Sequence, residues 1–67
     1  MSIVRSYTES NEIISEYSCN PNKIIHREND IPITEVDECI LKALFDVNDD
    51  ISRVEVEDDN GKCWSPV

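Results

Sequence analysis

Hydrophobic residues recur at helical spacing most clearly within residues 33–50 of the chain. At about 100° per residue, six apolar side chains fall on one face of a helix and predict a core-facing stripe of Val36, Cys39, Ile40, Ala43, Leu44 and Val47. Thr34 is a suitable N-cap, and Asp37 three residues later predicts a capping box with a shorter acid than the usual Glu. The turn-forming run Asn48-Asp49-Asp50 ends the predicted helix.

Leu41 and Phe45 lie one turn apart on this helix and do not belong to the stripe. A helix on one face of a single sheet leaves them in contact with water. Either a terminal segment or loop folds over them, or they form a partner-binding or self-association patch. We carry the second interpretation forward as a prediction, with the flanking Glu38 and Lys42 as part of the partner-binding surface.

Alternating or β-branched segments predict strands at residues 2–8, 13–19, 23–29, 51–57 and 63–67. Residues 13–19 also fit a short helix capped by Ser10, although their length and β-rich neighbours favour a strand. The first three segments are spaced as an antiparallel meander, and residues 29–32 predict the crossover into the helix, because Pro32 ends any earlier element. The order β-β-β-α-β-β predicts an α+β fold: a single antiparallel sheet of about five strands with one amphipathic helix packed on one face. We expect residues 1–67 to form one domain.

Two turns fit the last hairpin, and they place Trp64 on opposite faces of the sheet. A two-residue turn at Asn60-Gly61 puts Trp64 on the charged face. A three-residue loop, with Gly61 left-handed in a bulge, instead pairs Val56 with Trp64. Because burial of the indole against Val56 outweighs the local turn preference, we predict the bulged loop and expect Trp64 to be a core residue.

The 67 residues carry a net charge of -9, which makes direct binding to nucleic acid or to an anionic membrane unfavourable. An acidic surface suits solubility and a basic protein partner. We define a predicted acidic patch by its carboxylates, namely Asp46, Asp49, Asp50, Glu55, Glu57, Asp58 and Asp59. No apolar run approaches the length of a bilayer span and no signal peptide is recognisable, so we expect a cytosolic protein.

The cysteines are Cys19, Cys39 and Cys63, an odd number far apart in the sequence and without a C-x-x-C motif. This spacing argues against a disulfide framework and a structural zinc site, and Cys39 on the stripe is expected to be a small hydrophobic residue. Cys19 and His26 flank one turn and would be neighbours across a hairpin, but no local signature indicates a catalytic pair.

Positions 1, 3, 5 and 12 of a calcium-binding loop are matched by Asp46, Asn48, Asp50 and Glu57, but the sixth position is Ile51 rather than the required Gly, and a predicted strand follows. We therefore expect no metal or other cofactor and no catalytic residue.

The sequence resembles no family that we recognise. It favours a small acidic cytosolic protein-binding module without catalytic activity, acting through homodimerisation or as an accessory or regulatory subunit. The alternative is a phage or mobile-element inhibitor that blocks a nucleic-acid-binding protein through its acidic surface, as a nucleic-acid mimic.

Overall fold

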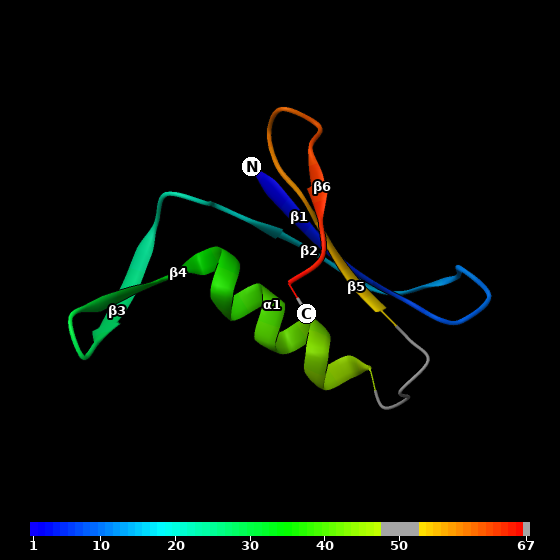
Figure 1. Ribbon diagram of the computed structural model, residues 1–67, viewed down its shortest axis with the longest axis horizontal. Coiled ribbons are helices and arrows are strands. Elements are labelled where there is room, and N and C mark those ends of the chain that lie inside the picture. Colours follow the sequence, from blue (N-terminus) through cyan, green and yellow to red (C-terminus); the bar gives the residue numbers. More distant parts are fainter. Residues whose placement is uncertain (48–52, 67) are drawn as a thin grey trace.

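The computed structural model describes residues 1–47 and 53–66 (Figure 1). Its elements in chain order are β1 (Ser2–Tyr7), β2 (Ile13–Cys19), β3 (Ile24–Glu28), β4 (Ile31–Thr34), α1 (Glu35–Asp46), β5 (Arg53–Glu57) and β6 (Cys63–Trp64). The fold is α+β with antiparallel sheets, as predicted, and residues 13–19 form a strand. Within these described residues no helix is long and apolar enough to cross a membrane.

The strands form two sheets rather than the single five-stranded sheet that the sequence predicted. The larger sheet has four strands in the order β2-β1-β5-β6, and the smaller one pairs β3 with β4. The prediction of a three-strand meander is wrong because β3 pairs with β4 and not with β2. Residues 29–32 are also not a crossover: Asn29 and Asp30 form a two-residue turn with φ of 51° and 65°, and Ile31 already begins β4. Positive φ at both central residues is the geometry of the tight hairpin turn, which outweighs the strand-breaking effect of Pro32.

Helix α1 covers one face of the four-stranded sheet. Along β1, Ser2, Val4 and Ser6 are buried, and the side chains between them point to the other face, which we call the open face. The core beneath α1 combines sheet and helix residues, namely Val4, Cys19, Val36, Cys39, Ala43, Val54 and Val56. The predicted stripe therefore does face the core, except that Leu44 is more exposed than expected.

The N-terminus of α1 follows the sequence prediction. Thr34 is the N-cap and forms a capping box with Asp37, whose carboxylate accepts from the Thr34 backbone N–H at 2.9 Å. The last helical residue is Asp46, and the predicted stop at Asn48-Asp49-Asp50 lies outside the described residues.

The second sheet projects from the body as a hairpin, which we call the arm and define as residues 23–34. Figure 1 shows it beyond the N-terminal end of α1, on the side away from the C-terminal half of the helix. All five residues of β3 are exposed. The base of the arm is fixed to α1 because the Glu35 N–H donates to the Lys23 carbonyl at 2.8 Å and the two side chains form an ion pair.

The last hairpin has the predicted register but not the predicted burial. Val56 pairs with Trp64, and Gly61 has a φ of 79°, as the bulged loop requires. Trp64 nevertheless remains 42% exposed, so its prediction as a core residue is wrong. The reason is that β6 is a two-residue strand at the edge of the sheet, whereas α1 lies mainly over β1 and β2.

Candidate functional site

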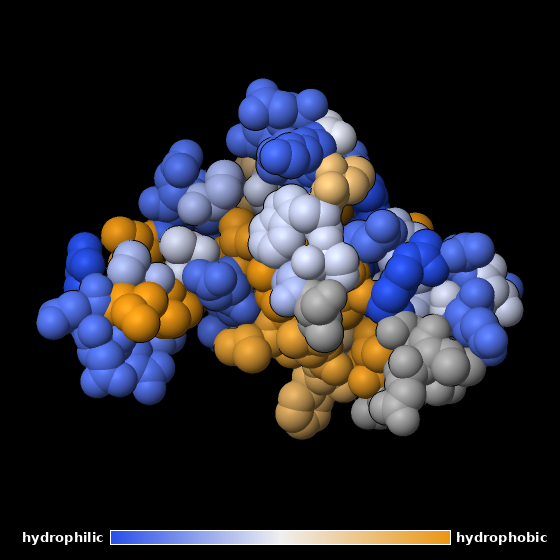
Figure 2. Space-filling model, in the orientation of Figure 1, coloured by the Kyte–Doolittle hydropathy of each residue, from blue (hydrophilic) through white to orange (hydrophobic). Residues whose placement is uncertain are grey.

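The side of α1 that points away from the sheet exposes large apolar side chains. Phe45 is 87% exposed and Leu41 is 60% exposed, and Leu44 beside them is also exposed. No described segment of the chain folds over them. Figure 2 shows hydrophobic surface gathered over α1 and a second patch over the arm, with hydrophilic surface around both. We call the surface formed by Leu41, Leu44 and Phe45 the outer face of α1.

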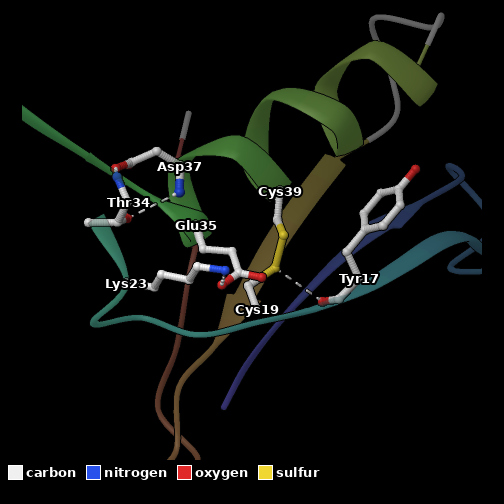
Figure 3. The surroundings of a disulfide bond; sticks show 7 residues. All are labelled: Tyr17, Cys19, Lys23, Thr34, Glu35, Asp37 and Cys39. Carbon is white, nitrogen blue, oxygen red and sulfur yellow. Dashed lines mark hydrogen bonds and ion pairs between the residues drawn. A yellow bond between two sulfur atoms is a disulfide. The ribbon is translucent and has the colours of Figure 1, made fainter. Parts of the chain in front are cut away.

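A disulfide between Cys19 and Cys39 holds this helix on the sheet (Figure 3). Cys19 ends β2 and Cys39 lies in the second turn of α1, and both are buried. The cysteine spacing argued against disulfides, but the structure has one, because the helix returns across the sheet and places two cysteines that are 20 residues apart beside each other. Cys39 is buried on the stripe as expected, but it is a covalent link rather than only a small hydrophobic residue.

A second contact between β2 and α1 lies at the other end of the helix. The Tyr17 hydroxyl donates a hydrogen bond to the Asp46 carboxylate. This bond favours the protonated phenol, so it raises the pKa of Tyr17, and desolvation by burial raises it further. With Cys39 near its start and Asp46 at its end, α1 is anchored along its length, and its outer face is presented in a fixed direction.

The two predicted flanking residues lie beside the outer face but differ in accessibility. Glu38 is half-buried, whereas Lys42 is exposed on the same turn as Leu41. The structure therefore brings together the four predicted partner-binding residues Leu41, Phe45, Glu38 and Lys42 on the outward side of one helix. They form an apolar centre with one carboxylate and one ammonium at its rim.

Carboxylates on β5 lie on the open face of the sheet, among arginines. Glu57 accepts from Arg5 at 3.4 Å, and Arg5 also donates to Glu16 at 2.7 Å. Glu55 forms an ion pair with Arg53 at 3.6 Å. The hydrogen bond from Arg5 to Glu16 is the main reason why the pKa of the Arg5 guanidinium is raised. The carboxylates of β5 are thus paired with arginines on the open face.

The acids of the β5–β6 turn take part in local structure. The Asp58 carboxylate accepts from the backbone N–H groups of Asn60 and Lys62, each at 2.9 Å, and so shapes the loop. Asp59 forms an ion pair with the N-terminal ammonium group. Asp49 and Asp50 lie outside the described residues. The described members of the predicted acidic patch are therefore distributed over the helix end, the open face and this turn.

Metal-ligating and catalytic residue types are not brought together in the described part of the chain. No group of three or more His, Cys, Asp and Glu side chains within it could hold a metal ion. The calcium-loop spacing depends on Asn48 and Asp50, which lie outside that part. The expected proximity of Cys19 and His26 is wrong, because β2 and β3 are not paired and Cys19 is in the disulfide.

The arm is the surface that sequence reasoning missed. Ile24, Ile25 and Ile31 are all exposed on it, and Ile31 is 62% exposed. The signal was present, since isoleucines on both sides of Asn29-Asp30 are typical of a tight hairpin. The hairpin was not predicted because Pro32 was expected to end the strand.

Comparison of the chain with protein-family models, with curated proteins and with solved structures finds no match.

Proposed function

We propose that this chain is a small protein-binding module without catalytic activity, which assembles as a homodimer through the outer face of α1. The observation that carries the proposal is the exposure of Leu41 and Phe45 on a helix whose other side packs on the sheet. Exposed apolar side chains that are contiguous and rimmed by polar groups are characteristic of interaction surfaces.

The energetics support an interface at this position. Transfer of a Leu or Phe side chain from water into a packed contact contributes about 1.5–3 kcal/mol, and aromatic side chains are frequent binding hot spots. The buried core beneath α1 and the Tyr17–Asp46 hydrogen bond hold the helix in place before binding. A surface that is already ordered loses less conformational entropy on association, which favours binding.

Size-exclusion chromatography with light scattering tests the proposal. We expect the wild-type chain at micromolar concentration to have twice the 7.7 kDa chain mass. The double variant Leu41→Ser/Phe45→Ser should elute as a monomer with an unchanged circular dichroism spectrum, because neither side chain supports the core.

The matched control is Ile13→Ser/Ile14→Ser, which replaces two exposed isoleucines at the start of β2. The control should remain dimeric. If the control dissociates the dimer and the α1 variant does not, the interface lies at β2 and the proposal is wrong. If the α1 variant unfolds, Leu41 and Phe45 serve the fold instead of a partner.

As a second candidate, we propose an inhibitor that blocks a basic nucleic-acid-binding protein. The supporting observation is that Glu55 and Glu57 are exposed in part on a sheet face that no described helix covers. Their pairing with Arg53 and Arg5 weakens the resemblance to a phosphate backbone, so this candidate ranks second. It requires salt-sensitive binding to a basic protein that Glu55→Gln/Glu57→Gln abolishes.

We propose a cytosolic location for the module. Disulfides are rare in reducing compartments, so a cytosolic chain should hold Cys19 and Cys39 mainly as adjacent thiols. Thiol alkylation in rapidly acidified cells tests this, and we expect both cysteines to be alkylated. If both resist alkylation, the disulfide is intact and the compartment is oxidising.

A further inference from the structure

Two of the apolar surfaces that the described residues expose are the outer face of α1 and the arm. The arm has isoleucines on each of its strands, with Ile24 and Ile25 on β3 and Ile31 on β4. An isolated two-stranded hairpin in water is marginally stable, so such an arm gains much from a surface that covers it. Each of the two surfaces thus exposes apolar side chains that contact with the other surface would bury.

The arm does not cover the outer face of its own helix. Both ends of the arm are fixed at the start of α1, because Thr34 is the N-cap of the helix and the Glu35 N–H donates to the Lys23 carbonyl. Phe45 is ten residues beyond Glu35, which is about 15 Å along the helix axis. Figure 1 shows the arm extending in the opposite direction from that half of the helix. The arm of one chain therefore does not contact the outer face of its own α1.

Charge distinguishes the arm from α1 as a partner for a second helix. The helix carries four carboxylates and one ammonium, a net negative charge, so two copies of α1 packed together would repel each other electrostatically. The arm carries two of the six Lys+Arg residues of the chain and only two of its 15 acids. Its cations are Lys23 and Arg27, and an arm beside the acidic helix avoids most of that repulsion.

We infer that the arm of one chain docks on the outer face of α1 of a second copy, an inference that rests on the proposed homodimer. Because each chain has one arm and one helix face, a two-fold axis lets both contacts form at once and closes the assembly as a dimer. The interface then has two apolar centres, each made by Ile31 and its neighbours against Leu41 and Phe45.

Photo-crosslinking identifies which segment meets the helix. Phe45 is replaced by the photo-crosslinker p-benzoylphenylalanine, which its exposure accommodates, and the variant is mixed with isotope-labelled chains that lack the crosslinker. Mass spectrometry should find the crosslinks in residues 24–33 of labelled chains. Parallel light scattering reports whether a dimer is present.

The outcomes separate the docking of the arm from the proposed homodimer. Crosslinks to α1 of the labelled chain would overturn arm docking and leave the homodimer standing. Crosslinks only to the arm of the same chain would also overturn it. A single-chain mass without crosslinks between chains would overturn both.

Ile31→Ser provides an independent measurement, with Ile13→Ser as the matched control. The two isoleucines have similar exposed fractions, 62% and 56%, and both lie on strands. We expect Ile31→Ser to raise the dimer dissociation constant at least about tenfold and Ile13→Ser to change it less than about twofold. Equal effects would contradict a specific role of the arm.

Discussion

The side chain of Tyr17 links the C-terminal end of α1 to the sheet. Its hydroxyl crosses from β2 to the Asp46 carboxylate, one residue beyond Phe45. The bond fixes the last turn of the helix, which carries the most exposed side chain of the outer face. Loss of this bond should therefore loosen the face that we propose as an interface.

The raised pKa of Tyr17 gives a measurable sign for this bond. A phenol whose pKa is higher in the folded chain than in the unfolded one stabilises the fold below about pH 10, and the contribution disappears as pH rises through the raised value. The difference between phenolate absorbance titrations of wild type and Tyr17→Phe should have a midpoint above 10. Asp46→Asn should lower that midpoint, and an unshifted wild-type midpoint would refute the hydrogen bond.

At the level of elements, local features were predictable and the pairing of distant segments was not. The capping box of Thr34 and the register of the last hairpin follow from residues a few positions apart, and both predictions are confirmed. The Cys19–Cys39 disulfide depends on where α1 crosses the sheet, which no local pattern encodes. Trp64 was misplaced for a related reason, since its burial depends on how far α1 reaches across the sheet.

The candidate site shows the same division. Because helical periodicity alone separates Leu41 and Phe45 from the core stripe, the sequence identified them correctly as off-stripe residues. Predicting the arm would have required the pairing of β3 with β4. The sequence pattern fits pairing of β3 with β2 equally well. Both pairings satisfy local strand propensity, so only the turn at Asn29-Asp30 distinguishes them.

Reduction of the disulfide should destabilise the link between β2 and α1. A cross-link over 20 residues of chain contributes about 3 kcal/mol in the loop-entropy model, which corresponds to a fall in melting temperature of roughly 10 °C or more. The measurement compares oxidised and reduced protein in a Cys63→Ser background, which removes the exposed third thiol. An unchanged melting temperature would show that the packing of Cys39 alone holds the helix.

For the molecule as a whole, the net charge of -9 acts against the compact state. The ion pairs of Arg5 and Arg53 offset only part of it, because 15 acids face six Lys+Arg residues. Added sodium chloride screens the remaining repulsion, so we expect it to raise the melting temperature modestly. A fall with salt would mean that the attractive pairs dominate.

Sedimentation velocity of the wild-type chain over a concentration series of about 1 to 100 µM tests self-association most directly. The account predicts a reversible shift from a species of 7.7 kDa to one of twice that mass as concentration rises, and a loss of the shift in Leu41→Ser/Phe45→Ser. A single species of 7.7 kDa at every concentration would contradict it.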